Sequence, residues 1–195
     1  MIEVSIQNYK NQLKVKESLF DSYFNNVTSK TILTSSPHSY RHRCEFGIHN
    51  FINGINYSMV KNHKLIEIDK YAICSRAIQS LMKPLLDRIK EDEILLHKLF
   101  QVEFQSSRSQ EVMVSLIYHK NLGPDWIRKV KLIKDDLKCS IIGRSKKQKL
   151  IIGQDYVTEE YQSINQSFKL NLYEQCFSQT NPDICDQIIN WVEEI

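Results

Sequence analysis

Two short clusters of basic residues are the features of this 195-residue sequence best suited to chemistry with a partner. One is Arg41-His42-Arg43, and the other is the turn-like run Arg144-Ser145-Lys146-Lys147. Such clusters bind phosphate when they share a face with exposed rings, for which Phe100 and His119 are candidates. Each feature also has an ordinary interpretation. Basic clusters are usually solvated, Phe100 at the start of an alternating strand is normally core, and His119 lies at a strand end. The residue types alone leave both interpretations open.

The cysteines give little support for a metal, disulfide or catalytic site. There are five, widely spaced and never in a C-x-x-C pair, so neither a disulfide framework nor a zinc knuckle is predicted, and a reducing compartment fits best. Cys44 and His42 could form a thiol and base pair, but the third, orienting group that such catalysis needs is missing. We therefore expect Cys44 to be a buried structural cysteine.

Other motifs exclude several classes of protein. The glycines are isolated, so there is no G-x-G-x-x-G loop or P-loop for a nucleotide cofactor. The histidines never occur four apart with a carboxylate between them, so no metal site is predicted. A membrane span requires about 18 consecutive uncharged residues, and no stretch of the sequence comes close to that length. No signal peptide is apparent. A cytoplasmic protein without a membrane partner is expected. The net charge of +3 is compatible with a polyanionic partner but does not predict one.

The order of the predicted elements indicates the fold class. Helices are expected at 7–24, 72–92, from Pro124 to Leu137, and at 181–195, each from its apolar periodicity. Strands are expected within 38–51, 55–60, 64–68, 100–105, 112–118, 139–143 and 148–153, followed by an extended piece at 163–179. Because the strands come in runs, we predict an α+β fold with a mainly antiparallel sheet and flanking helices.

Five segments, found in order along the chain, connect these elements to a known family. They are HSYRHRCEF (38–46), LHKLFQVEF (96–104), VSLIYHKNL (114–122), IIGRSKKQKL (141–150) and FSQTN (177–181). Together they resemble the bacterial tRNA uracil-5-methyltransferase family, most of all the members that form ribothymidine in the tRNA T-loop. The resemblance covers essentially the whole chain. It implies an RNA-binding α+β region, followed by a Rossmann-like domain that binds S-adenosylmethionine.

The resemblance also implies roles for single residues. Phe100 and His119 match the family's rings that contact the unfolded T-loop, where an extruded base leaves neighbours that must be covered by stacking. Arg41 and Arg43 match its Y-R-x-R-x-E-F segment and are expected to meet the RNA backbone. The basic run with Arg144, Lys146 and Lys147 is expected to add to the same RNA surface.

Only one residue matches the methyl-donor site. Gln179 corresponds to the glutamine of the family's F-x-Q-x-N stretch, whereas the glycine-rich donor loop, the nucleophilic cysteine and the glutamate base have no counterpart in this sequence. We therefore expect an RNA-binding region at 1–170 and, at 171–195, a connector and the entry helix of a truncated methyltransferase domain. The chain alone is expected to bind the tRNA T-arm and to transfer no methyl group.

Two alternatives remain. The chain could be a stand-alone RNA-binding module, against which the uncapped final helix and the orphan Gln179 argue. It could also be a decayed or protein-interaction product that has lost RNA binding. Gly47 favours the second alternative, because relatives commonly carry an arginine there and one charge-assisted RNA contact is therefore missing. The apolar stripe of the final helix also predicts a loose attachment or self-association.

Overall fold

The computed structural model describes the backbone of residues 6–194 and the side chains of residues 8–194. Its helices are α1 (Ile6–Tyr23), α2 (Arg76–Lys90), α3 (Glu93–Leu96), α4 (Pro124–Leu137) and α5 (Pro182–Glu193). Its strands are β1 (Arg43–Phe51), β2 (Gly54–Lys61), β3 (Lys64–Ile68), β4 (Leu99–Ser106), β5 (Val112–Tyr118), β6 (Ser140–Ser145), β7 (Gln148–Ile152), β8 (Tyr156–Gln162) and β9 (Ser167–Tyr173).

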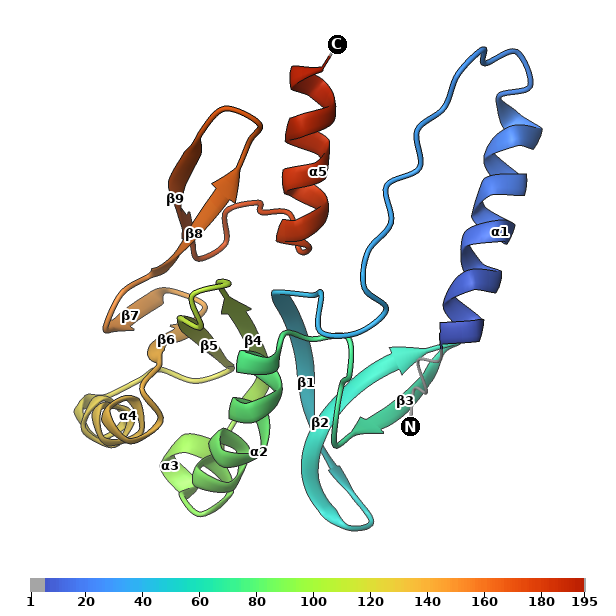
Figure 1. Cartoon of the computed structure of the whole chain (residues 1–195). Coiled ribbons are helices and arrows are strands. Elements are labelled where there is room, and N and C mark those ends of the chain that lie inside the picture. The colour runs from blue at the N-terminus through green and yellow to red at the C-terminus, as the bar shows by residue number, and fades with distance from the viewer. Residues whose placement is uncertain (1–5, 195) are drawn as a thin grey trace.

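The strands form one large sheet and one hairpin (Figure 1). The seven-stranded sheet has the order β3-β2-β1-β4-β5-β6-β7, while β8 and β9 pair with each other. All pairs are antiparallel except β5 and β6, which are parallel and are joined through α4. The predicted α+β class with a mainly antiparallel sheet is therefore confirmed.

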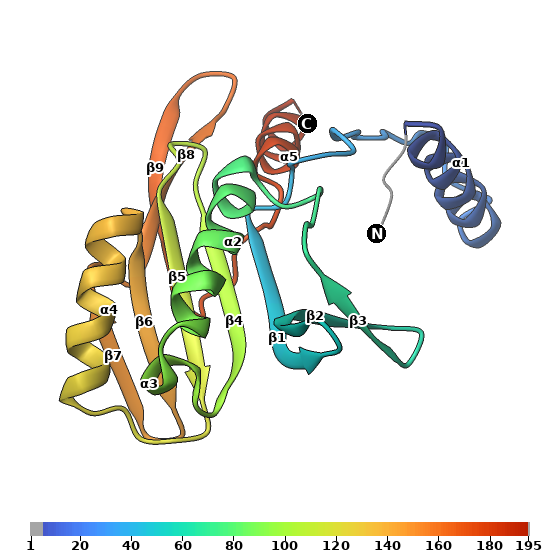
Figure 2. The same cartoon turned by 90° about the horizontal axis from the view of Figure 1, so that it is seen from below.

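The core lies on the face of the sheet that α2 and α4 cover (Figure 2). Leu85 and Ile89 of α2 and Trp126 and Val130 of α4 are buried there against inward-facing strand residues. The inward residues alternate with residues on the opposite face, as the pleat of a strand requires. We call that opposite face the open face. The hairpin β8–β9 covers part of it, where Met113 packs in a small apolar cluster.

Local signals place the helix ends. The Ser75 side chain accepts a hydrogen bond from the Ile78 amide and caps α2, so the helix begins later than its apolar period predicted. Pro124 occupies the first turn of α4, as expected, and Asn181 caps α5.

Two elements were not predicted, the short helix α3 and the strand β8. In β8, Val157 and Tyr161 are buried on the same side as Glu159, whose side chain is only 2% exposed. Because Glu159 occupies an inward position, the sequence of β8 does not alternate between apolar and polar residues as an amphipathic strand does.

Helix α5 is joined to the rest of the protein by an ionic cluster. Arg108, in the β4–β5 turn, donates to Glu159 at 2.8 Å and to Asp186 of α5 at 2.5 Å. It also bonds the Glu160 carbonyl oxygen. The apolar side of α5 remains partly uncovered, because Trp191 and Val192 are exposed.

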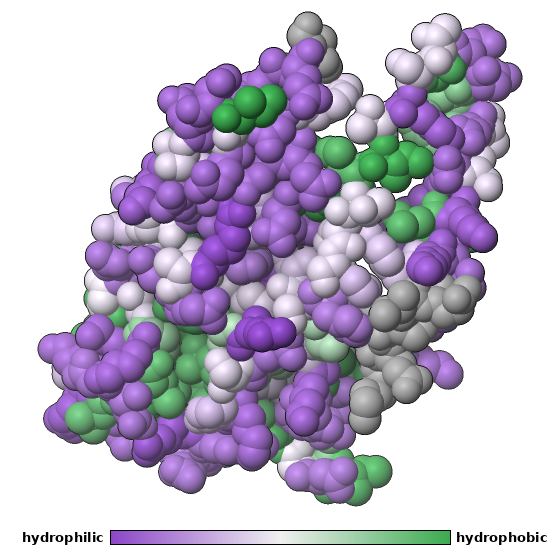
Figure 3. All heavy atoms as spheres, in the orientation of Figure 1, coloured by the Kyte–Doolittle hydropathy of each residue, from purple (hydrophilic) through white to green (hydrophobic). Residues whose placement is uncertain are grey.

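Helix α1 stands apart from the sheet and is joined to it by a long extended segment (Figure 1). A groove of about 670 Å³ lies between α1 and residues 30–40. Apolar surface gathers along this hollow between α1 and α5 (Figure 3). Leu13 is half-buried, whereas Leu19, Phe20 and Tyr23 are exposed, as expected for a weakly amphipathic surface helix.

Cys44 and Cys74 are joined by a disulfide, a pair that the sequence reasoning did not predict. Cys44 is buried in β1, as expected, and Cys74 lies just before α2. The two are 30 positions apart in sequence, so no spacing motif reveals them. An isolated bridge between Arg41 and Cys74 brings the two segments together in the fold.

Candidate nucleic-acid interface

A β-bulge in β4 removes Phe100 from the core. Strict alternation would place Phe100 on the same face as the buried Val102 and Phe104. The register of β4 on β5 shifts between Leu99 and Gln101, however, which leaves Phe100 as the extra residue. Phe100 is only partly buried and lies outside the core cluster. The ordinary interpretation of Phe100 as a core residue is therefore wrong.

Phe100 is stacked on His119. The ring centroids are 3.9 Å apart and the ring planes differ by 10°. His119 directly follows β5 and is exposed. Its amide donates a hydrogen bond to the carbonyl oxygen of Lys98, which directly precedes β4. Tyr118 points into the core, so alternation directs His119 to the open face. We refer to Phe100 and His119 as the ring pair.

The basic turn lies at the same end of the sheet as the ring pair. Ile117 is in register with Arg144 across the parallel β5–β6 pair, which places the residues after Ile117 beside the turn. Lys146 and Lys147 are exposed at its tip. The fold thus brings together two features that are about 25 to 45 residues apart in sequence.

Arg144 differs from the two lysines because it has a structural partner. Its guanidinium lies 3.3 Å from Glu174, a carboxylate only 3% exposed. The Ser115 hydroxyl donates to the same carboxylate, and the Lys149 ammonium lies 3.3 Å from it. This cluster fixes the end of β9 to the open face, so much of the charge of Arg144 is already neutralised.

Arg41 and Arg43 lie towards the other end of β1. Arg43 is in register with Gln105, whereas Gly47, four residues on, is in register with Gln101 next to the ring pair. At about 3.3 Å per residue this separation is roughly 13 Å. Alternation from the buried Cys44 directs Arg43 to the open face, as predicted, but not next to the rings.

Both arginines already make hydrogen bonds within the protein. The Arg43 guanidinium donates to the Cys176 carbonyl oxygen at 2.6 Å, and Arg41 Nε donates to the Arg43 carbonyl oxygen at 2.9 Å. These bonds hold the side chains in place and leave other guanidinium N–H groups for a phosphate.

Carboxylates separate the arginines from the ring pair, a feature that sequence reasoning missed. Gln101 donates to Glu103 at 3.1 Å and to Glu45 at 3.4 Å. Burial raises the pKa of Glu103, and the Arg43 charge opposes that change. Carboxylates repel phosphate but accept hydrogen bonds from base N–H groups. These carboxylates therefore suit the edges of bases. In the sequence they could have been found from the polar residues that alternate with apolar ones in β4.

Gly47 is covered by neighbouring side chains. A Cβ atom at this position would lie 2.6 Å from Ser58 Oγ and 3.2 Å from the His49 ring, and those two groups are hydrogen-bonded to each other at 2.7 Å. An arginine at this position would have to displace that pair.

Gln179 is exposed and lies beside Arg43 and His42 around a narrow depression. Burial lowers the pKa of His42, while Glu159 and Asp183 oppose that change. The depression is too small to enclose a nucleoside, so the described residues around Gln179 do not by themselves form a site for S-adenosylmethionine. Among residues 6–194 no group of three or more His, Cys, Asp or Glu is arranged to hold a metal ion. None of the helices in this part of the chain is long and apolar enough to cross a membrane.

Comparisons with known proteins show the family of the chain. Residues 8–195 match the family model described as tRNA (Uracil-5-)-methyltransferase. The tRNA/tmRNA (uracil-C(5))-methyltransferase of Acinetobacter baumannii (strain AYE) is 34% identical over 191 residues, covering 94% of this chain and 53% of that protein. The enzyme of the same name from Wolinella succinogenes is 37% identical over 191 residues, covering 94% and 52%. The chain thus spans about half the length of these curated relatives.

The fold has a solved counterpart. The crystal structure of Pyrococcus abyssi tRNA (uracil-54, C5)-methyltransferase in complex with S-adenosyl-L-homocysteine superimposes with a TM-score of 0.72. The match covers 95% of this chain and 48% of that one at 17% identity, so it supports the fold alone. The family match, which extends over nearly the whole chain, shows that this chain belongs to the tRNA (uracil-5-)-methyltransferase family.

Proposed function

We propose that this chain is the tRNA-binding part of an S-adenosylmethionine-dependent enzyme that forms 5-methyluridine in the T-loop of tRNA. The observation that carries the proposal is the ring pair, which a β-bulge holds outside the core beside a basic turn. Stacked rings suit unpaired bases, and exposed lysines suit the phosphates that connect them.

In this proposal the open face divides its contacts with RNA by chemistry. The ring pair takes an unstacked base, Lys146 and Lys147 take phosphates, and Arg41 and Arg43 meet the backbone at the other end of β1. Glu45 and Glu103, between these sites, accept from base N–H groups.

Methyl transfer is assigned to the part of the enzyme that the relatives have and this chain does not span. We infer that residues 1–170 are the RNA-binding region and that 171–195 are the connector and entry helix of the methyltransferase domain. Gln179 is proposed to reach the donor only when that domain is present. The protein is proposed to act in the cytoplasm, where tRNA is modified.

The alternative of a decayed RNA-binding module is favoured by one observation. Gly47 lies where the resemblance to the family leads us to expect an arginine, and the His49–Ser58 pair occupies the space above it. Under this alternative the sheet is intact but the chain does not bind T-arm RNA. A binding titration with T-arm RNA distinguishes the two cases.

Two measurements test the proposal. Fluorescence anisotropy with a labelled, unmodified T-arm hairpin at low salt should show binding that weakens steeply as salt rises. A methyl-transfer assay with labelled S-adenosylmethionine and unmodified tRNA should show no incorporation by residues 1–195 alone. Activity should appear when the remaining domain of a relative is added in trans.

Absence of binding at low salt, with the protein shown to be folded by circular dichroism, would support the decayed-module alternative. Incorporation of label by the 195-residue chain would show that the active site lies within it. A DNA hairpin of the same sequence is the matched control, because it keeps the charge and lacks the 2′-hydroxyl groups.

A further inference from the structure

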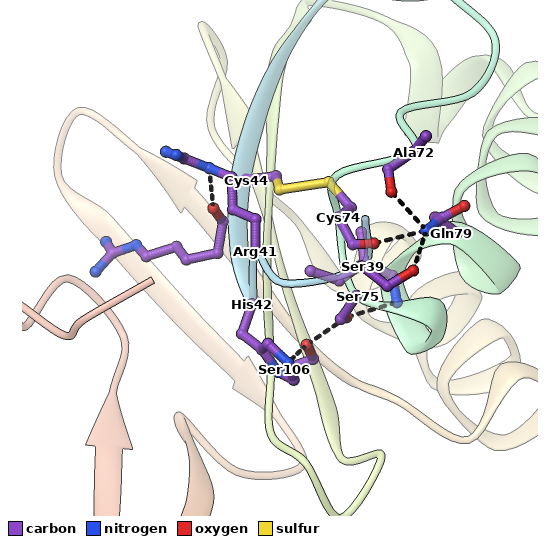
Figure 4. The surroundings of a disulfide bond; sticks show 11 residues. Ser39, Arg41, His42, Cys44, Ala72, Cys74, Ser75, Gln79 and Ser106 are labelled. Carbon is purple, nitrogen blue, oxygen red and sulfur yellow. Dashed lines mark hydrogen bonds between the residues drawn. A yellow bond between two sulfur atoms is a disulfide. The ribbon is translucent and has the colours of Figure 1, made fainter. Parts of the chain in front are cut away.

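The disulfide joins the segment that carries Arg41 to the start of α2 (Figure 4). Three backbone hydrogen bonds run beside it. The Ser39 amide donates to the Ala72 carbonyl oxygen at 3.0 Å, the Arg41 amide to Ile73 at 2.8 Å, and the Ser75 amide to Arg41 at 2.8 Å. We call residues 39–43 the clamped segment, since both of its proposed RNA-binding arginines are held next to the disulfide.

Side-chain bonds extend this junction. Gln79 donates to the Cys74 carbonyl oxygen at 2.6 Å, and the Ser75 and Ser106 hydroxyls are hydrogen-bonded at 2.7 Å. Ser106 also lies 3.2 Å from the His42 ring (Figure 4). The disulfide therefore lies where the clamped segment, α2 and the end of β4 meet, and its state bears on all three.

A protein that modifies tRNA works in a reducing compartment, where disulfides are usually transient or redox-sensing rather than structural. We propose that Cys44 and Cys74 form a reversible thiol–disulfide pair that fixes the clamped segment when oxidised and loosens it when reduced. The reducing compartment and the effect on RNA binding rest on the proposed function, whereas thiol–disulfide exchange at the pair can be measured independently of it.

The chemistry is thiol–disulfide exchange with a low-molecular-weight disulfide such as glutathione disulfide. One cysteine thiolate attacks the glutathione disulfide, forms a mixed disulfide and releases one glutathione thiolate. The second cysteine thiolate attacks the protein sulfur of that mixed disulfide, closes the Cys44–Cys74 bond and releases the second glutathione. The protein loses two electrons and two protons, and glutathione disulfide gains both to become two glutathione molecules.

Access to the pair requires local opening. Cys44 is 4% exposed and Cys74 is fully buried, so neither meets a reagent in the closed fold. Tyr71, Ala72 and Ile73, which lead to Cys74, are only partly buried. Opening of this short loop would expose Cys74 without unfolding the sheet. Exchange at the pair should therefore be slower than at the exposed Cys176.

Thiol counting tests the pair without any RNA. The protein is equilibrated in reduced or oxidised glutathione, denatured in acid, labelled with a maleimide mass tag, and weighed. Fully reduced protein should carry five tags, one for each cysteine. Oxidised protein should carry three, for Cys139, Cys176 and Cys185, where a bound glutathione, recognised by its added mass, is counted as a tag. Cys139→Ser should lower both counts by one and keep the difference of two. Cys44→Ser should abolish the difference. Five tags in both buffers, or three in both, would overturn the proposal.

Hydrogen exchange then tests the clamp. Reduction should speed exchange at the Ser39, Arg41 and Ser75 amides about tenfold, since a crosslink no longer limits local opening. The Val114 and Leu116 amides of β5 serve as internal controls and should not change. If exchange at the three amides did not change while the tag counts were as expected, the cysteines would form a redox pair that does not fix the clamped segment. That result would overturn this part of the proposal.

RNA binding by the two forms separates this inference from the proposed function. Oxidised protein should bind the T-arm hairpin about threefold to tenfold more tightly, because the clamped segment is ordered beforehand. Cys44→Ser should bind equally in both buffers. No binding by either form would contradict the proposed function and leave the thiol counts and exchange rates to decide the clamp. Equal binding by both forms would overturn its effect on RNA.

Discussion

The ring of Phe100 and the imidazole of His119 lie face to face, with centroids 3.9 Å apart. Because each ring has a second face, the pair can be extended by a nucleobase that stacks on its outer side. Stacking on a preformed pair needs little reordering of either side chain, so the cost in conformational entropy is small.

Replacing Phe100 by alanine should therefore weaken T-arm binding by roughly 1 to 3 kcal/mol and change the free energy of unfolding little. Fluorescence anisotropy and thermal unfolding would measure the two quantities. Tyr23→Ala is the matched control, because that ring is 73% exposed on α1, away from the ring pair. If Phe100→Ala instead lowered the free energy of unfolding by roughly 3 to 5 kcal/mol, as is expected for alanine at the buried Phe104, Phe100 would be a core residue.

The salt dependence of binding should identify the phosphate contacts. Lys146→Gln and Lys147→Gln should each lower the slope of log K against log salt by about 0.7 to 0.9, since each removes one phosphate contact. Lys131→Gln, on the exposed side of α4, should leave the slope unchanged. If all three variants behave alike, only net charge matters and the basic turn has no specific role.

Arg108→Met should destabilise the protein by roughly 3 to 5 kcal/mol, because the buried Glu159 would lose its cationic partner and keep only the backbone amides of residues 108 and 160 as donors. Chemical denaturation would measure the loss, and hydrogen exchange should show α5 amides exchanging faster. Arg128→Met removes an exposed pair with Asp125 and should cost less than about 1 kcal/mol. Equal losses in the two variants would mean that the ionic cluster does not hold α5.

Acid should destabilise the protein through His42. Its folded pKa is lowered, first by burial, so the unfolded chain takes up a proton at a higher pH than the folded chain does. The stabilisation is thus present above the unfolded pKa of about 6.5 and falls as pH drops through that value.

Denaturation midpoints between pH 7.5 and 5.0 should show this loss of stability. His42→Gln should flatten that part of the profile relative to His38→Gln, which alters an exposed histidine. Parallel profiles for the two variants would assign the acid sensitivity to other groups.

Most of the fold could be predicted because its elements follow simple periods. The apolar stripe of α2, the proline that opens α4 and the turn at Asn62 all act through neighbouring residues, and the structure has each of them. Strand β8 was missed for a physical reason: the inward Glu159 is paired with Arg108, which lies 51 residues away. Local patterns contain no information about such a distant partner.

The candidate site likewise combines features that local sequence patterns predict with features that depend on distant residues. The basic turn and the two rings were predicted as candidates, but their proximity depends on the β5–β6 register and on the bulge beside Phe100. The pairing of Arg144 with Glu174 and the disulfide between Cys44 and Cys74 depend on tertiary contacts in the same way.

The strand order has a consequence for how the chain folds. Each strand of the large sheet pairs with the next in sequence except at the β1–β4 seam, whose two strands are separated along the chain by β2, β3, α2 and α3. Closing that seam brings Arg43 beside Gln105 and is a long-range step that costs loop entropy. During synthesis on the ribosome, the β1–β3 meander can form early, and α2 can then cover its inward face, but the free edge of β1 stays unpaired until β4 emerges. The slow phase of refolding should therefore report the closing of this seam, and substitutions there should slow folding more than those in the hairpins.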